Sequence, residues 1–396
     1  MRLKSEKSVH LSYCTNIHAG DDWSDVFPQL QRELPKIKKA VSPDQPFGMG
    51  LRVSKLSATQ LVGDTLETFL DWMRNEGLYV YTVNGFPYGP FHGTTVKQDV
   101  YKPDWADKAR LEYTRELIDL CARLNPPDQY ASISTVPGTY KQWAEGRLPA
   151  IAENLLQCVA HSMRVESETG VRVALSLEPE PCCLLETNQE AIEFFKQWLY
   201  TRDAINRLSK IANCSPGDAD KAIHSLIGIC YDVCHAAVEF EDPVESLSQI
   251  QSAGIPIIKI QLSSALCLNQ VNDKSIQHLA AFNEPVYLHQ VVEKDNSKLN
   301  RYTDLSEAIT SREKAPPSPD AQWRVHFHVP VFMKDMPHFS TTQDVLEQVL
   351  QIQKQQTLST HLEVETYTWD VLPESVRNVA IDKAIAREID WVTQRL

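Results

Sequence analysis

The sequence predicts an α/β fold in which eight parallel strands close into a (β/α)8, or TIM, barrel, with an elaborated segment between strands seven and eight. Short apolar runs alternate with helical patterns along the chain, which is typical of parallel βαβ units. Eight such units can be counted if residues 323–332 are an elaboration before the last strand. An open doubly wound sheet is the alternative, but no G-x-G-x-x-G turn follows the first predicted strand.

The predicted elements can be placed along the chain by their apolar periodicity. The predicted barrel strands occupy residues 9–15, 47–53, 78–86, 130–136, 172–180, 227–235, 256–264 and 360–369. The predicted helices occupy residues 25–40, 58–75, 104–124, 142–168, 188–211 with a break near Thr201, 243–253, 342–355 and 374–394. Residues 265–322 follow a looser pattern. With no internal repeat, we expect one TIM-barrel domain over residues 1–396.

Composition excludes several classes of protein. Of the 396 residues 42% are hydrophobic, so the chain can bury a large core. The net charge of −13 argues against a nucleic-acid partner. The chain contains no run of about 20 apolar residues, so we expect no membrane span, and its first residues lack the apolar segment of a signal peptide. Nine cysteines without zinc-ribbon spacing favour reduced thiols in a cytoplasmic protein.

Polar side chains collect at the predicted carboxyl ends of the strands. The stretch VRVALSLEPEP runs as a buried strand into Glu178 and Glu180, and such carboxylates cost free energy unless something pairs with them. Active sites of TIM barrels lie at these strand ends. The other strand ends supply Asn16 and His18, Arg52, Asn84 with His92 in the following loop, Asp232 and His235, Gln261 and Ser263, His326 and His328, and Glu363 and Glu365. Several carboxylates on one face need a counter-charge, which predicts a divalent metal ion such as Mn, Zn, Co, Fe or Mg.

Each of these residues also has a simpler interpretation. Glu178 could cap the next helix or pair with an arginine, and Asp232 could cap a helix that carries His235 on its surface. The two histidines of HFHV would face one side of a strand, which could equally be a solvated side. Cysteines near the site more often pack than react. The joint occurrence of these residues in register with the strands favours the functional interpretation.

The strand ends resemble those of a known superfamily. A glutamate after strand five, D-x-x-H after strand six and a glutamate after strand eight resemble the xylose isomerase-like TIM barrels, which include sugar isomerases, sugar epimerases and the endonuclease IV group. The longer phrases HLSYCTNIHAGDDW, YLHQVV, VHFHVPVF and LEVETYTW look like the EboE-type metabolite traffic proteins, over almost the whole chain. That resemblance implies a role in processing or traffic of a small metabolite, with partners encoded in the same bacterial gene cluster.

The resemblance also implies a set of metal ligands. Sugar epimerases of the superfamily hold one metal with a glutamate, an aspartate, a histidine and a glutamate from strands five to eight, which match Glu178, Asp232 and Glu365. Strand seven offers Gln261 in place of the histidine. We expect His328, rather than His326, to complete the ligand set, because Pro330 favours an extended end to that segment. The endonuclease group uses D-x-H and the D-x-x-H histidine, here His235, for a further metal.

The first functional hypothesis is a metal-dependent isomerase or epimerase of a sugar or polyol, in which Glu178 and Glu365 transfer protons. The substrate would contact other strand-end residues, namely His18, Arg52, Asn84, His92, His235 and Gln261. A metal-dependent hydrolase or phosphodiesterase of the endonuclease IV type is the first alternative, because the HFH pair could hold a second metal. A non-catalytic metabolite carrier is the other, favoured by the missing histidine of strand seven. The sequence leaves the oligomeric state open.

Overall fold

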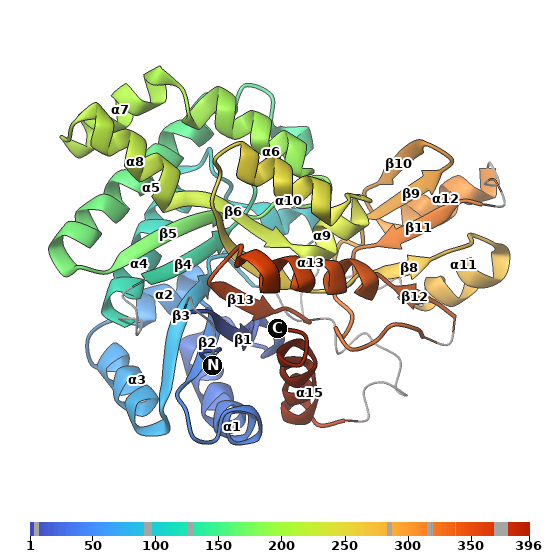
Figure 1. The fold of residues 1–396 in the computed structure, drawn as a ribbon, viewed down its shortest axis with the longest axis horizontal. Helices are drawn as coiled ribbons and strands as arrows, with labels where there is room; N and C mark the ends of the chain where they lie inside the picture. The colour runs from blue at the N-terminus through green and yellow to red at the C-terminus, as the bar shows by residue number, and fades with distance from the viewer. Residues whose placement is uncertain are drawn as a thin grey trace.

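The chain folds into a closed barrel of parallel strands surrounded by helices, with a smaller antiparallel sheet beside it (Figure 1). The computed structural model describes residues 1–3, 8–90, 97–124, 130–282, 287–314, 318, 320–336, 338–367 and 379–396. None of the helices in these ranges is long and apolar enough to cross a membrane. The nine cysteines all lie in these ranges, and none forms a disulfide.

Eight strands form the barrel in the order β1-β13-β7-β6-β5-β4-β3-β2, and all neighbouring strands in this order are parallel. Their bounds are β1 His10–Tyr13, β2 Phe47–Arg52, β3 Leu78–Asn84, β4 Tyr130–Thr135, β5 Arg172–Leu177, β6 Ile227–Asp232, β7 Ile257–Leu262 and β13 His361–Val364. A parallel bridge between Cys14 and Gly50 closes the ring between β1 and β2. The TIM barrel predicted from the sequence is confirmed.

Helices connect and cover these strands. They are α1 Trp23–Val41, α2 Lys55–Gln60, α3 Gly63–Glu76, α4 Lys108–Leu124, α5 Leu148–Thr169, α6 Asn188–Phe194, α7 Arg202–Ala212, α8 Pro216–Leu226, α9 Val233–Val238, α10 Pro243–Ser252, α13 Gln343–Gln356 and α15 Ile381–Thr393. Shorter helical segments are η1 Thr15–Ile17, η2 Lys97–Tyr101, η3 Lys141–Trp143, η4 Phe195–Leu199 and η5 Ala280–Phe282. The break expected near Thr201 is present, because the Thr201 hydroxyl caps α7 by accepting a bond from the Ala204 amide. The sequence reading missed α8.

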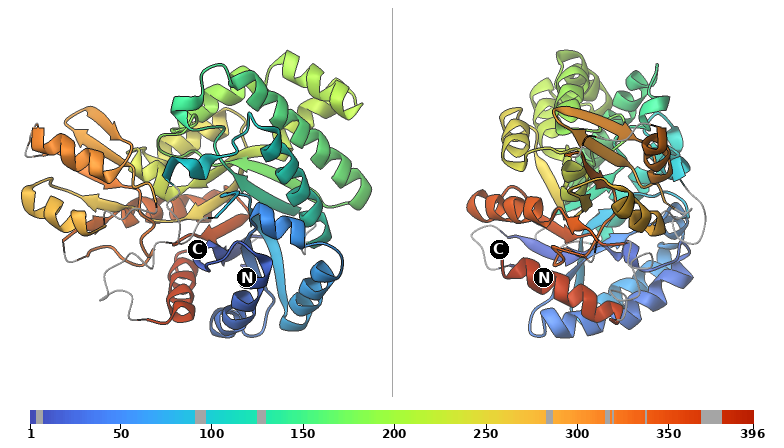
Figure 2. Two further views of the ribbon diagram at one scale, coloured as in Figure 1. Left: turned by 180° about the vertical axis from the view of Figure 1, so that it is seen from behind. Right: turned by 90° about the vertical axis from the view of Figure 1, so that its right-hand side faces the viewer.

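The segment between β7 and β13 forms a five-stranded antiparallel sheet in the order β10-β9-β11-β8-β12, which we call the insertion (Figure 2). Its elements are β8 Leu266–Leu268, α11 Asp273–Leu279, β9 Val291–Asp295, β10 Lys298–Tyr302, α12 Leu305–Lys314, β11 Gln322–Val325 and β12 Ser340–Thr341. The insertion packs around its own apolar cluster, which includes Trp323 and Phe327. Its two ends meet, because the amide of Ala265 donates to the Thr342 hydroxyl and the Thr342 amide donates to the Ala265 carbonyl. The elaboration predicted between strands seven and eight is therefore confirmed.

Inward-facing side chains fill the barrel in layers beneath its carboxyl end. Lys259 of β7 and Glu363 of β13 form an ion pair of 2.5 Å in the middle layer. Both alternate along their strands with outward apolar residues, so that Gln261 and Glu365 stand one layer above them. Gly50 of β2 makes room for this pair, since a Cβ atom there would lie 1.4 Å from Glu363 Oε1. The polar layers thus place the next inward residues at the barrel's open end.

Candidate metal centre

A cavity of about 60 Å³ lies where the barrel's carboxyl end meets the insertion. The barrel strands and loops contribute Asn16, Asn84, Phe86, Pro87, Lys97, Val100, Tyr101, Glu178, Glu180, His235, Gln261, Glu365 and Tyr367, and the insertion contributes Tyr287, Leu288, Gln290, His326 and His328. Lys97 ties the two parts together, because its ammonium group lies 2.6 Å from Asp304 Oδ2 and donates to the Tyr287 carbonyl. The insertion therefore forms one wall of the cavity.

Three carboxylates come together at the carboxyl end of the barrel, and two of them, Glu178 and Glu365, line this cavity. Glu178 follows β5, Asp232 ends β6 and Glu365 follows β13, so parallel strands deliver all three to one end of the barrel. One carboxylate oxygen of each lies within 4.8 Å of the others, and all three residues are buried. This is the group of carboxylates that the strand ends predict as metal ligands.

Burial and mutual repulsion make this group electrostatically unusual. Burial, then the charges of Glu365 and Asp232, raise the pKa of Glu178 well above its ordinary value. Burial, then Asp232, likewise raise the pKa of Glu365. Burial alone would also raise the pKa of Asp232, but His235, His328 and the Ser263 hydroxyl together lower it. In the absence of a cation, Glu178 and Glu365 therefore favour the protonated form, whereas Asp232 favours the ionised form.

Two buried carboxylate oxygens of this group lack a hydrogen-bond donor in the part of the chain that the structure describes. Asp232 Oδ1 accepts bonds from the Ser263 hydroxyl at 2.7 Å and the His235 amide at 3.1 Å, whereas Oδ2 has no partner. Glu365 Oε1 accepts a bond of 2.7 Å from Asn16, whereas Oε2 has none. Buried polar atoms are normally satisfied, and a divalent cation is the counterpart that two such oxygens fit.

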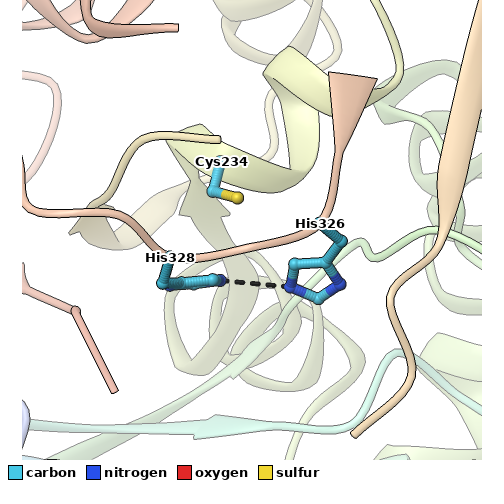
Figure 3. Close-up of side chains that lie close together, drawn as sticks. All are labelled: Cys234, His326 and His328. Atoms are coloured by element: carbon cyan, nitrogen blue, oxygen red, sulfur yellow. Dashed lines mark hydrogen bonds between the residues drawn. The ribbon is translucent and has the colours of Figure 1, made fainter. Parts of the chain in front are cut away.

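Three histidines form a second cluster beside the carboxylates. His235 lies on α9 of the barrel, whereas His326 and His328 follow β11 of the insertion. The Nε2 atom of His326 lies 3.1 Å from that of His235 and 3.1 Å from that of His328. Figure 3 shows the ring of His328 directed at that of His326. All three are buried.

The partners of the Nδ1 atoms fix where each ring carries its proton. His235 Nδ1 lies 3.0 Å from the Pro179 carbonyl oxygen, and His328 Nδ1 lies 3.0 Å from the carbonyl oxygen of Glu365. Carbonyl oxygens only accept, so both Nδ1 atoms carry hydrogen. Burial lowers the pKa of both rings, that of His235 to about 4, so both are neutral and their Nε2 atoms present lone pairs.

Gln290 fixes the third ring in the same way. Its Nε2 group donates to the Pro181 carbonyl at 3.2 Å, which identifies the other amide atom as oxygen. That oxygen lies 2.7 Å from His326 Nδ1, which therefore also carries hydrogen. Burial, then His235 and His328, lower the pKa of His326 well below its usual value. Three lone pairs thus face one another, an arrangement that a metal cation stabilises.

The backbone that carries His326 and His328 differs from the strand predicted over residues 323–332. The strand β11 ends at Val325. The Phe327 amide then donates to the Val325 carbonyl, and the Val329 amide donates to the Phe327 carbonyl. These tight turns keep a two-residue repeat, so both histidines still reach the cavity although the sheet has ended.

A further donor flanks each pair of histidines. Asp232 lies with His235 and His328, Glu180 with His235 and His326, and Cys234 with His326 and His328. In each group one ligand atom per residue lies within 4.8 Å of the others. The donor set of oxygen, nitrogen and sulfur atoms fits divalent metals such as zinc, manganese, iron or cobalt.

Only some of the predicted substrate-binding residues line the cavity. Asn84 and Gln261 line the cavity with His235, but Gln261 Oε1 accepts a bond from the Cys230 thiol at 3.0 Å. His18 lies outside the lining, with Nε2 2.9 Å from the Tyr13 hydroxyl.

Arg52 is also absent from the cavity lining. Its guanidinium lies 2.6 Å from Asp21 Oδ1 and donates to the Gly20 carbonyl, so its side chain is directed at the loop after β1. His92 lies outside the described residues.

Sequence reasoning missed Lys259, Gln290 and Cys234 as members of the site. Lys259 has the same strand parity as Gln261 and Ser263, so the alternation of the strand predicts that its side chain points into the barrel. Gln290 immediately precedes β9 in the insertion, where the sequence predicts no strand. Cys234 lies inside D-x-x-H, where the sequence alone favours a packing role for a cysteine.

Comparison with known proteins supports the fold. No protein-family model and no curated protein matches this sequence. Among solved structures, a xylose isomerase-like TIM barrel protein from Mycobacterium smegmatis in complex with magnesium is 10% identical, with 99% of this chain and 98% of that chain covered and a TM-score of 0.51. A D-tagatose 3-epimerase-like protein is 12% identical over 97% and 98% of the chains (TM-score 0.48), and an IOLI protein with a zinc atom is 12% identical over 97% and 96% (TM-score 0.45). At 10% identity, the likeness to the Mycobacterium smegmatis protein shows a shared TIM-barrel fold alone.

Proposed function

We propose that the protein is a divalent-metal-dependent enzyme that isomerises or epimerises a small sugar or polyol. The observation that carries this proposal is the convergence, in and beside one small cavity, of three imidazole lone pairs and two carboxylate oxygens that have no donor among the described residues. Glu178, Asp232 and Glu365 would hold one ion, with Gln261 beside them, and His328 stands next to Asp232 in the adjoining cluster. Such an ion, when bound, polarises a substrate carbonyl and its neighbouring hydroxyl.

Glu178 and Glu365 are suited to proton transfer at the substrate. They approach the cavity from β5 and β13, which are separated in the barrel by β6 and β7. They therefore face a bound molecule from different sides. One carboxylate would remove the proton from a carbon atom and the other would return it, which is the transfer that isomerisation and epimerisation require.

The cavity walls favour a small substrate. Tyr101, Tyr287 and Tyr367 line it together with the insertion, so that the reacting groups lie under protein and away from bulk water. Asn84 is held in place by Lys259 and Glu363 and presents its side chain to the same space. A net charge of −13 also disfavours a polynucleotide substrate.

The role in metabolite processing or traffic is the finer part of this proposal. It is supported by the likeness of HLSYCTNIHAGDDW, YLHQVV, VHFHVPVF and LEVETYTW to EboE-type proteins. All four phrases carry residues of the cavity wall, namely Asn16, Gln290, His328 and Glu365 among others. A metabolite of that kind, and partners encoded beside the gene, are the corresponding proposals for substrate and partners.

A metal-dependent hydrolase is the second candidate, because Asp232 belongs to both the carboxylate group and a histidine group. A carboxylate shared by two ions is the arrangement that two-metal hydrolases use. A phosphodiester or other ester of a small molecule would then be the substrate.

Deuterium exchange tests the first proposal directly. The protein, purified without chelator and loaded with Mn²⁺, is incubated in D2O with aldoses, ketoses and polyols, and NMR follows exchange at carbon and the appearance of isomers. Glu178→Gln and Glu365→Gln should each lower turnover at least 100-fold. Glu388→Gln, a buried carboxylate outside the cavity, is the matched control and should retain turnover.

Other outcomes would decide between the candidates. Hydrolysis of small phosphodiesters without carbon exchange would replace the isomerase with the hydrolase. Saturable binding of a sugar without exchange or hydrolysis would identify a carrier. A protein that binds no divalent metal after dialysis against Mn²⁺, Zn²⁺ and Co²⁺ would contradict both enzymatic proposals.

A further inference from the structure

The histidine cluster includes a thiol that the proposed reaction does not use. Cys234 lies in the first turn of α9, immediately before His235, and its side chain is fully buried. Its Sγ atom lies within 4.8 Å of one ring nitrogen each of His326 and His328 (Figure 3). The hydrogen bond assigned to the thiol is a long one, 3.7 Å to the Phe327 carbonyl.

We propose that Cys234 binds a metal ion together with His326 and His328, with His235 next to them, forming a zinc-class site separate from the carboxylate group. Thiolate and imidazole ligands select borderline-soft ions such as Zn²⁺, whereas carboxylates and amides also suit Mg²⁺ and Mn²⁺. The inference rests on the proposed metal dependence, and it adds the class of the second ion and the identity of one ligand.

The spacing of the histidine nitrogens fits a four-coordinate ion. Bonds of 2.0–2.1 Å to nitrogen in a tetrahedron imply nitrogen atoms about 3.3 Å apart. The two distances in the cluster are both 3.1 Å, from His326 to His235 and from His326 to His328. With each Nδ1 atom bonded to an oxygen, all three rings already have the tautomer and orientation that metal ligation needs.

Cys234 is the flanking donor with least to lose by ligation. Glu180 Oε1 already accepts a 2.7 Å bond from the Tyr101 hydroxyl. Asp232 also faces Glu178 and Glu365, whose ion it would help to hold. The thiol of Cys234 would exchange only its long contact with the Phe327 carbonyl for a metal–sulfur bond, and its proton would pass to solvent.

Such an ion would join two separate parts of the fold. Cys234 and His235 belong to the barrel, whereas His326 and His328 belong to the insertion. A shared ion would fasten the insertion over the cavity that it walls. The ion would thus hold the substrate space closed as well as contribute charge.

Cobalt substitution tests the thiolate ligand without any assay of turnover. The full-length protein is stripped of metal, loaded with Co²⁺, and its absorption spectrum recorded with the bound cobalt quantified by elemental analysis. We expect a near-ultraviolet sulfur-to-cobalt charge-transfer band in the wild-type protein. Cys234→Ser should abolish the band, whereas Cys230→Ser, which alters a second buried thiol near the cavity, should keep it.

Each outcome bears on a different claim. Bound cobalt without the band in the wild-type protein, or a band that persists in Cys234→Ser, would overturn the thiolate ligand and leave the proposed isomerase standing. A band with no turnover on any sugar would support this site and count against the proposed function. Absence of cobalt binding would overturn both. If Cys234→Ser does not fold, the wild-type and Cys230→Ser spectra still decide.

Discussion

The ammonium group of Lys259 lies 2.5 Å from the carboxylate of Glu363, and neither side chain reaches solvent. Asn84 joins both, since its Oδ1 accepts a 2.8 Å bond from Lys259 and its Nδ2 donates at 3.0 Å to Glu363. Burial alone would lower the pKa of Lys259, but Glu363 and other nearby acidic groups raise it above its usual value. A buried ion pair therefore supports the layer on which the candidate metal centre stands.

Removal of one member of this pair should be costly. Lys259→Met would leave Glu363 buried without its cation, and we expect a loss of about 3–5 kcal/mol in the free energy of unfolding. The double variant Lys259→Met/Glu363→Gln removes both charges and should recover more than half of that loss. Urea denaturation of the apo protein measures both. A double variant no more stable than the single one would show that the ion pair is not the cause.

Gly50 should resist even the smallest side chain. A Cβ atom at this position would lie 1.4 Å from Glu363 Oε1 and 2.5 Å from its Cδ, so the buried carboxylate would have to move. We expect Gly50→Ala to lower the free energy of unfolding by about 3 kcal/mol or abolish folding. Gly217→Ala, in α8, meets nothing closer than Ser215 Oγ at 3.8 Å and should be neutral or slightly stabilising. Equal melting temperatures for the two variants would contradict the packing argument.

Gln290 should control metal affinity without touching the ion. Gln290→Leu removes the acceptor of His326 Nδ1, so the ring would no longer be held in the tautomer that directs a lone pair at the cluster. We expect the affinity for Zn²⁺ to fall about 10–100-fold in competition with a chromophoric chelator. Gln249→Leu, on the exposed side of α10, is the control. An unchanged affinity for Zn²⁺ in Gln290→Leu would show that the Gln290 amide does not influence the metal centre.

Glu388 should make stability depend on pH. Its Oε1 accepts bonds from the Val331 amide and the Thr366 hydroxyl, and burial raises the pKa of this carboxyl from 4.5 to about 7. The folded protein therefore binds this proton more tightly than the unfolded chain. The resulting stability is fully present below pH 4.5 and is lost as the pH rises to about 7.

Glu388→Gln isolates this contribution. The difference in unfolding free energy, wild type minus variant, should fall by on the order of 3 kcal/mol between about pH 4.5 and pH 7. Above pH 7 this difference should stay constant. Urea denaturation of both proteins across this range measures the difference, in which titration of the remaining groups cancels. If the unfolding free energies of the two proteins change with pH in the same way, the raised pKa of Glu388 has no effect on folding.

The barrel and its carboxylates could be predicted because both follow short-range rules. Strand periodicity locates β5, β6 and the last barrel strand within a few residues, and the parallel arrangement then brings their ends together. That reasoning places Glu178, Asp232 and Glu365 side by side without knowledge of any loop. Whether they bind metal remains a prediction.

The structure of the insertion and its contribution to the cavity could not be predicted in the same way. The strand β10 consists of KLNRY, which has no fully buried residue and no apolar alternation, and its pairing with β9 depends on contacts within the insertion. The hydrogen bond between Gln290 and His326 joins a residue just before β9 to a residue just after β11. Arg52 shows the reverse case, since its strand end pointed to the cavity but Asp21 in the neighbouring loop engages its guanidinium.

The seam between the first and last barrel strands has a consequence for how the chain folds. His10 of β1 pairs in register with His361 of β13, so one edge of β1 has no partner until residues 361–364 have been synthesised. During synthesis that edge, and the edge of β7 that β13 later covers, are open to pairing with other nascent chains. Contacts so distant in sequence also slow the closing step. Aggregation during expression should therefore be governed by the time that these two edges stay uncovered, and cooler, slower refolding at low protein concentration should favour closure over intermolecular association.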